Sequence, residues 1–197
     1  MTMTTSRGEF LSAGMRGGLA LVAGGSLLAA ASGPAIAQPT GDVAIAKLAA
    51  TAELLAIDFY GRAIHHGGFA GDVLAYLEAA RQNERDHYDA LAAVIGSRSP
   101  AGMRFRYAAG TFASPASIAA TGVAAETAFV GAYLGAVEAF EDDDLKAAAG
   151  WIGANEAQHL TVLRRLAAGG ALVPNPSFPE SLTSVQALAA VTPFLAP

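Results

Sequence analysis

The 197-residue sequence contains no cysteine and carries few charges. Without cysteine the chain has no disulfide bonds, and it cannot hold zinc or an iron–sulfur cluster through thiolates. Any metal ion bound here must be held by carboxylate and imidazole groups. Charged residues make up 15% of the sequence, with a formal net charge of −5, and there is no basic stripe with interleaved aromatic residues. We therefore expect no nucleic-acid partner.

Apolar residues are abundant by contrast, at 53% of the sequence, and alanine occurs throughout. A chain of this length is typical of one domain. We expect its core to be large but built from small side chains.

The first 37 residues have the features of an export signal. Arg7 and Arg16 supply positive charge, an apolar run covers residues 19–31, and residues 35–37 have the small-x-small form of a cleavage site. Because the run is too short to span a bilayer comfortably, we expect a cleaved signal over residues 1–37 and a periplasmic or extracellular protein without a stable membrane span. A retained anchor is the alternative. The segment around Arg7 resembles a twin-arginine signal but has Gly8 in place of the second arginine, so both secretion routes remain open.

Four long segments have the periodicity of helices bounded by glycine, proline or capping residues. They run from about Val43 to His66, Asp72 to Ile95, Pro115 to Phe140, and from Asp142 to just before Gly169, with Asp42 and Ser114 as expected N-caps. Short connections within the first and second pairs predict two antiparallel hairpins, and residues 96–114 are long enough to cross the bundle from end to end. The sequence predicts an all-α four-helix bundle over residues 38–170 with this long crossover between its hairpins.

Residues 171–197 follow the last long segment as a tail with several prolines. A short helix is predicted near Ser184–Val191. We expect the tail to pack on the bundle through Phe178, Leu188 and Phe194.

The most informative motif is Glu-x-x-His, which occurs once in each half of the chain. In both halves a lone glutamate precedes the motif by one helix length. The six candidate metal ligands are therefore Glu53, Glu84, His87, Glu126, Glu156 and His159.

All six lie on the apolar stripes of the predicted helices, which would place them in the core. A buried carboxylate costs several kcal/mol unless it is paired, and these stripes contain no lysine or arginine. Two divalent cations would balance the four carboxylates, and a Glu and a His three residues apart project from one helix face. The pattern predicts a two-metal site. Surface salt bridges and a buried polar network without metal are the alternatives.

Each lone glutamate is followed two helical turns later by a tyrosine, Tyr60 after Glu53 and Tyr133 after Glu126. These tyrosines are either core residues or partners of the ligands that could donate a hydrogen bond or an electron.

The order of the six ligands resembles that of the ferritin-like superfamily of di-iron carboxylate bundles. Together with the expected export signal, the segment 126–133 and the linker residues Phe105 and Phe112 make the chain most similar to exported bacterial ferritin-like proteins related to desiccation-related proteins. The resemblance implies that Glu53 and His87 hold one ion, that Glu126 and His159 hold the other, and that Glu84 and Glu156 bridge them.

The same resemblance implies iron, with manganese as the alternative, and oxidation of Fe(II) by oxygen or peroxide. No haem is expected, because Met103 is the one methionine left after cleavage and lies in the predicted linker. A homo-oligomer remains open. Two readings without turnover also remain: a metal-binding protein that protects against stress or desiccation, and a structural bundle with a vestigial site.

Overall fold

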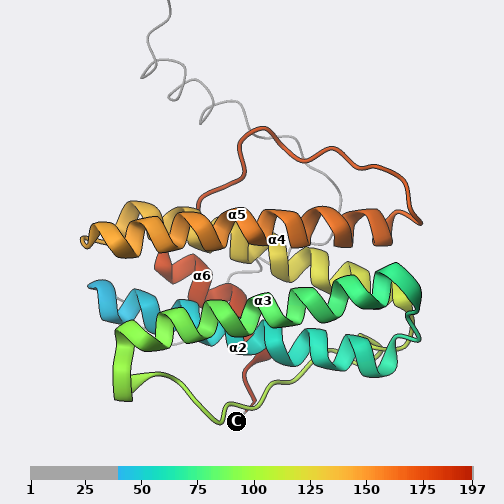
Figure 1. Cartoon of the computed structure of the whole chain (residues 1–197), viewed down its shortest axis with the longest axis horizontal. Coiled ribbons are helices and arrows are strands. Elements are labelled where there is room, and N and C mark those ends of the chain that lie inside the picture. Colours follow the sequence, from blue (N-terminus) through green and yellow to red (C-terminus); the bar gives the residue numbers. More distant parts are fainter. Residues whose placement is uncertain (1–39, 197) are drawn as a thin grey trace, which may run out of the picture.

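The structure is a computed structural model that describes residues 40–196, so the expected export signal lies outside the described residues. Its main elements are four helices of 25 residues each: α2 (Asp42–His66), α3 (Gly71–Ile95), α4 (Pro115–Ala139) and α5 (Asp143–Ala167) (Figure 1). The predicted all-α four-helix bundle is confirmed.

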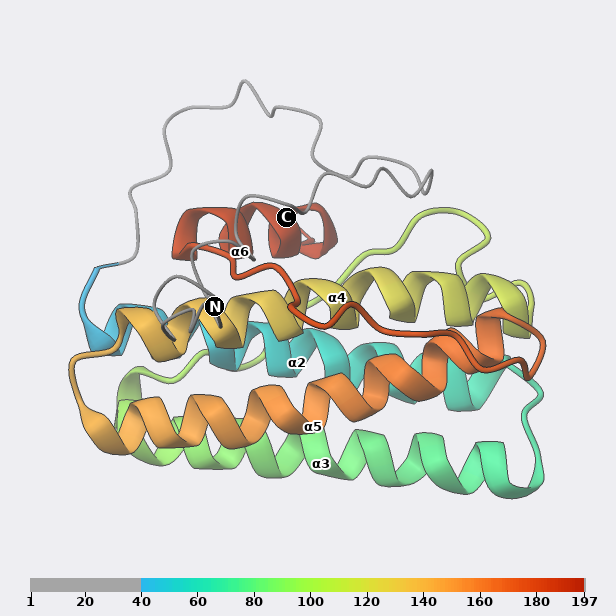
Figure 2. The same cartoon turned by 90° about the horizontal axis from the view of Figure 1, so that it is seen from above.

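The four helices form two antiparallel hairpins that pack side by side. Helix α2 packs mainly on α3, helix α4 packs mainly on α5, and α2 and α4 join the hairpins. A 3-10 turn, η1 (Gly96–Arg98), ends the first hairpin. The crossover then runs from one end of the bundle to the other before α4 begins (Figure 2). This direction places α3 and α5 together on the side of the bundle away from the C-terminal helix α6 (Ser184–Val191) (Figure 2).

One of the two expected N-caps, Ser114, is confirmed. The Ser114 side chain accepts from Ser117 N–H in a capping box, and the Asp142 side chain accepts from the first turn of α5. The prediction that Asp42 caps α2 is wrong, because Gly41 occupies the N-cap position. The Asp42 carboxylate instead accepts from the backbone N–H groups of Glu141 and Asp142, at 2.9 Å each. It therefore ties the start of α2 to the turn between α4 and α5.

The tail returns across α2 and α4 as helix α6 (Ser184–Val191) and the 3-10 turn η2 (Thr192–Phe194) (Figure 2). Its buried residues are Ala187 and Val191, while Phe194 packs on the core from a partly buried position. Phe178, which we expected to pack on the bundle, has a side chain that is 59% exposed, so most of it faces solvent. The tail nevertheless contacts the bundle on both sides of this residue: the Asn175 side chain bonds to Arg164 and Thr161 of α5, and the Leu182 N–H donates to the Gly131 carbonyl of α4.

Helix α4 is the most apolar of the long helices. By length and composition it is the one helix in the described part of the chain that could cross a membrane, but half of its most apolar window is buried in the bundle. A core helix passes the same test, and α4 is in contact with α2, α5 and α6. Its apolar character is therefore explained by its central place in the fold.

Candidate metal centre

The six candidate ligands converge on one region in the middle of the bundle. The four carboxylate residues and His159 are at most 2% exposed, whereas the His87 side chain is 13% exposed. Each of the four helices contributes at least one of these side chains. The four glutamates come from four separate helices and lie close together in the core. This position agrees with their places on the apolar faces of those helices.

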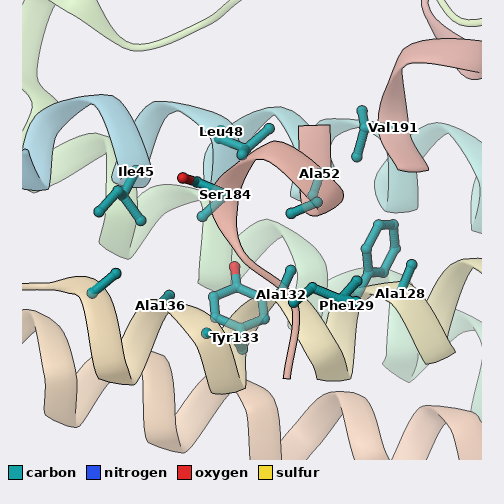
Figure 3. Close-up of a pocket in the computed structure, with 15 residues that line it drawn as sticks. Ile45, Leu48, Ala52, Ala128, Phe129, Ala132, Tyr133, Ala136, Ser184 and Val191 are labelled. Carbon is teal, nitrogen blue, oxygen red and sulfur yellow. The ribbon is translucent and has the colours of Figure 1, made fainter. Parts of the chain in front are cut away.

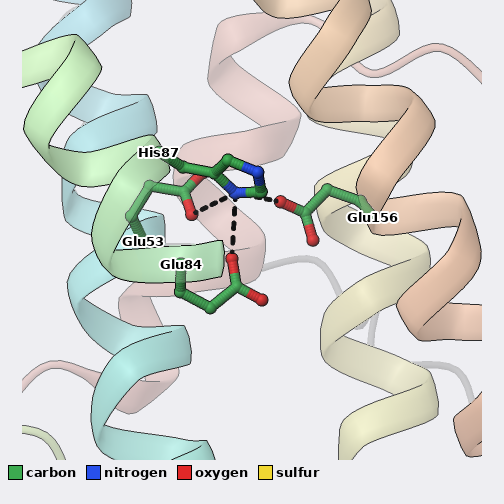
Figure 4. A group of neighbouring side chains, drawn as sticks. All are labelled: Glu53, Glu84, His87 and Glu156. Atoms are coloured by element: carbon green, nitrogen blue, oxygen red, sulfur yellow. Dashed lines mark hydrogen bonds and ion pairs between the residues drawn. The ribbon is translucent and has the colours of Figure 1, made fainter. Parts of the chain in front are cut away.

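The first half of the cluster surrounds His87, which projects from α3 (Figure 4). Its Nδ1 atom lies 3.1 Å from Oε1 of Glu156, 3.2 Å from Oε2 of Glu84 and 3.4 Å from Oε2 of Glu53. One atom of each of these four residues lies within 4.8 Å of the others. Such a group of three oxygens and one nitrogen can hold a metal ion.

The second half of the cluster surrounds His159, which projects from α5. Its Nδ1 atom lies 2.9 Å from Oε1 of Glu84, 3.2 Å from Oε2 of Glu156 and 3.8 Å from Oε1 of Glu126. This second group also meets the distance criterion for a metal site. Glu84 and Glu156 belong to both groups, which is the grouping implied by the resemblance.

The carboxylate oxygens are poorly satisfied by the protein alone. Oε1 of Glu84, Oε2 of Glu126 and Oε1 of Glu156 are buried and accept no hydrogen bond. The other oxygen of Glu84 lies 3.2 Å from Nδ1 of His87, and the other oxygen of Glu156 lies 3.2 Å from Nδ1 of His159, both within hydrogen-bonding distance. Among the described residues, the ion-pair partners of the four carboxylates are the two histidines. Buried polar atoms without partners are rare in proteins. The residues present therefore fit a pair of divalent cations better than a metal-free polar network.

The protonation of the cluster reflects this crowding. Burial raises the pKa of Glu53 and Glu126 well above the usual carboxyl value, and the charge of Glu156 raises both further. Burial alone would lower the pKa of His159, but its contacts with Glu156 and Glu84 raise it to about 9. Burial likewise opposes ionisation of Glu156, yet contacts with His159 and His87 lower its pKa to about 2. Without metal, protons on some of these groups therefore supply the positive charge that the cluster needs.

Two tyrosines complete the cluster, each donating to a carboxylate on another helix. The Tyr60 hydroxyl donates to Oε1 of Glu126 at 2.5 Å, and the Tyr133 hydroxyl donates to Oε1 of Glu53. Both side chains are at most 2% exposed. Of the two readings from the sequence, partnership with the candidate ligands therefore holds alongside burial in the core.

The sequence analysis missed two asparagines beside the cluster. Nδ2 of Asn83 lies 3.2 Å from Nε2 of His159, and Oδ1 of Asn155 is buried without a partner. If Nδ1 of His159 binds a metal, Nε2 keeps its proton and becomes a donor. The Asn83 side chain must then turn its amide so that Oδ1 faces Nε2 in place of Nδ2. This turn exchanges two atoms of nearly the same size and shape. The signal was present in the sequence, because an asparagine directly precedes the glutamate in both motifs.

Comparison with known proteins agrees with this geometry. The family model described as a ferritin-like domain matches residues 41–169. This segment contains all four long helices and the six candidate ligands. No curated protein matches the sequence significantly. With the family model covering more than half of the chain, the chain belongs to the ferritin-like domain family.

Proposed function

We propose that this chain is an exported ferritin-like protein that binds two divalent metal ions, with iron as the metal, and oxidises Fe(II) with oxygen or peroxide. The observation that carries the proposal is the set of buried carboxylate oxygens without hydrogen bonds that face the Nδ1 atoms of two histidines. Oxygen and imidazole ligands suit both iron and manganese, so manganese is the alternative metal.

In this proposal Glu53 and His87 hold one ion, Glu126 and His159 hold the other, and the carboxylates of Glu84 and Glu156 are shared between them. Four carboxylates carry the charge that two divalent cations balance. The protons that these groups hold in the metal-free protein must leave as metal binds.

The surrounding residues orient the ligands and keep bulk water away. Tyr60 and Tyr133 each fix one oxygen of a terminal carboxylate by a hydrogen bond. His159 is 1% exposed and His87 is 13% exposed, so the cluster is more accessible on the side of His87, which projects from α3. Metal ions and water would enter on that side.

The proposed reaction balances with dioxygen or hydrogen peroxide as the oxidant. Two Fe(II) ions each lose one electron, and one dioxygen accepts both electrons and two protons to leave as hydrogen peroxide. With peroxide as the oxidant, the same two electrons and two protons break its O–O bond and leave two water molecules. The carboxylic acid and imidazolium protons of the metal-free site are local sources for these protons.

A metal-binding protein that protects against stress without turnover is the second candidate. It rests on the same buried ligand set, combined with the resemblance of the chain to desiccation-related proteins. The two candidates differ in one measurable property, which is oxidation of bound Fe(II).

The test uses the full chain, loaded with Fe(II) without oxygen and then exposed to oxygen or peroxide. We expect two ions per chain by metal analysis and a rapid rise in the absorbance of ferric oxo species. The double variant Glu84→Ala/His159→Ala should lose most of this metal. A matched control changes the exposed Glu78 on α3 and the exposed Gln158 on α5 to alanine, and it should bind metal like the original chain.

Unchanged metal content in the double variant would show that the ligand assignment is wrong. Two bound ions that resist oxidation by both oxidants would instead favour the protective role. Export is tested separately, by locating the full chain in the cell and determining the N-terminal residue of the mature form.

A further inference from the structure

A small apolar cavity lies where helix α6 crosses α2 and α4 (Figure 3). Its volume is about 40 Å³. Seven of its fifteen lining residues are alanines, including Ala128, Ala132 and Ala136 on one face of α4, and Val191 of α6 lies at one side. None of the described residues that line it is charged, and its polar side chains are those of Tyr133 and Ser184.

The roof of this cavity is held by a close contact between the tail and α4. The Leu182 N–H donates to the carbonyl of Gly131 at 2.9 Å. A Cβ atom at Gly135 would lie 1.8 Å from the Leu182 carbonyl oxygen. The tail therefore rests directly on the α4 backbone, and two glycines of that helix make room for it. The side chains beneath it are too small to fill the space, although protein interiors are normally close-packed.

The inner end of the cavity lies next to the candidate metal centre. Tyr133 lines the cavity, and its hydroxyl donates to Glu53, one of the candidate ligands. In Figure 3 the Tyr133 ring lies among the side chains that line the cavity, with its hydroxyl directed toward the α2 side. A single side chain therefore connects the apolar cavity with the carboxylate cluster.

The walls and the size of the cavity select its occupant. The cavity is partly open at its outer side, where Ala139 is exposed. Apolar walls offer water no hydrogen-bond partners and bind small apolar molecules, and roughly 10–15 Å³ is needed for each water-sized molecule. The space therefore suits a diatomic gas. It cannot satisfy a hydrated metal ion or an anion, which require polar or charged partners. Hydrogen peroxide would also lack most of its hydrogen bonds there.

We propose that this cavity binds dioxygen and delivers it past Tyr133 to the carboxylate cluster. The inference rests on the proposed oxidation of Fe(II). It separates two routes into the bundle: dioxygen enters beneath α6, whereas metal ions and water enter on the side of His87. The electrons for its reduction come from the two Fe(II) ions, as balanced above.

The test combines xenon binding with oxidation kinetics on the full chain. Xenon is an apolar probe of similar size whose binding requires neither metal nor turnover, and it can be followed by 129Xe NMR. We expect one xenon site in the original chain, lost in Ala132→Leu and weakened in the milder Ala128→Val. Ala120→Leu is the matched control, because Ala120 is exposed on the same helix and does not line the cavity; it should keep the site.

In the iron-loaded protein, Ala132→Leu should raise the oxygen concentration needed for half-maximal oxidation several-fold. Its metal content and its oxidation by peroxide should stay unchanged. If the leucine disrupts the fold, shown by a lost helical circular dichroism signal, Ala128→Val provides the same comparison.

The outcomes separate the two proposals. If the original chain oxidises Fe(II) but binds no xenon, or if both filling variants keep the original oxygen dependence, the cavity is not the oxygen route. If the original chain binds xenon and iron but oxidises nothing with either oxidant, the proposed oxidation has failed, and the delivery role fails with it.

Discussion

The hydroxyl of Tyr60, on α2, donates a 2.5 Å hydrogen bond to Oε1 of Glu126, on α4. Tyr133 on α4 donates to Glu53 on α2 in return. Each tyrosine therefore supports the ligand of the other half of the repeat, and the pair joins the two hairpins at the candidate centre.

Replacing Tyr60 with phenylalanine should affect both stability and metal binding. Oε1 of Glu126 would lose a buried donor, and an unsatisfied buried group costs about 1–3 kcal/mol. We expect a lower free energy of unfolding in urea for the metal-free protein and weaker metal binding by chelator competition. Tyr88→Phe is the control, because Tyr88 donates to the Pro100 carbonyl away from the cluster. Equal metal affinity in the two variants would contradict a role for Tyr60 at the centre.

The metal-free protein should become less stable as the pH rises. The pKa of His159 is raised to about 9 in the folded chain, against about 6.5 when unfolded, and the pKa values of Glu53 and Glu126 are also raised. Between these two pKa values, about pH 6.5 to 9, the folded state therefore binds more protons than the unfolded state. The unfolding free energy falls as the pH rises through this range.

Melting temperatures of chelator-treated protein across that pH range would measure this effect. His159→Ala should flatten the dependence, whereas His65→Ala, at an exposed position at the end of α2, should not. Bound metal should reverse the trend, because metal competes with protons for the same groups. A metal-free protein whose melting temperature rises with pH would overturn the assigned protonation states.

Glu126→Gln should separate stability from metal binding. Burial and the charges of Glu156 and Glu84 favour the protonated form of Glu126, which a glutamine side chain resembles in shape and charge. We expect the metal-free variant to melt at or above the temperature of the original chain near pH 8, while metal analysis shows at least tenfold weaker binding of one ion. Glu138→Gln, at an exposed site on α4, should change neither property. Strong destabilisation of the metal-free variant would argue against a carboxyl group held protonated by burial.

Asn83→Ala should weaken metal binding without removing a ligand. Asn83 contacts Nε2 of His159, and loss of such a partner of a metal-binding histidine typically lowers affinity about 10–100-fold. Asn83→Asp should restore most of the affinity, because its carboxylate accepts the same proton. Gln82→Ala, at the exposed neighbouring position, is the control, and competition with a metal-sensitive dye measures all three. Affinity that is equally low in the aspartate variant would point to lost packing.

Two glycine-to-alanine changes should have opposite effects on stability. A Cβ atom at Gly135 would lie 1.8 Å from the Leu182 carbonyl oxygen, so Gly135→Ala should displace the tail and cost about 1–3 kcal/mol. Gly150, on α5, has open space around its Cβ position, so Gly150→Ala should stabilise the helix by about 0.5–1 kcal/mol. Urea denaturation measures both. A neutral Gly135→Ala would show that the tail is not held on α4 at this point.

The helices were predictable because their signals are local. Pro115 after Ser114, the aspartates before α5 and the glycine at the end of α3 stand next to the residues they affect. The six candidate ligands were also found, because a carboxylate in an apolar stripe conflicts with its neighbours on the same helix. The asparagine before each Glu-x-x-His motif was overlooked although the same repeat contains it.

Other features depend on segments far apart along the chain. Asp42 has the side chain of an N-cap, yet its carboxylate binds the turn before α5. Phe178 is apolar enough for a core, but the path of the tail leaves it exposed. The type of a residue determines which interactions its side chain can form. Whether Asp42 and Phe178 form them depends on the positions of segments that are distant in the sequence.

The order of residues along the chain thus settles the number of helices, their ends and the chemistry of the groups facing inward, because these follow from periodicity and from neighbours within a few residues. Packing settles which groups meet. The direction of the long crossover and the register of the two hairpins place Tyr60 on Glu126, Tyr133 on Glu53 and a small apolar cavity beside the carboxylates. Those contacts join residues many turns apart in the sequence, so no local pattern encodes them.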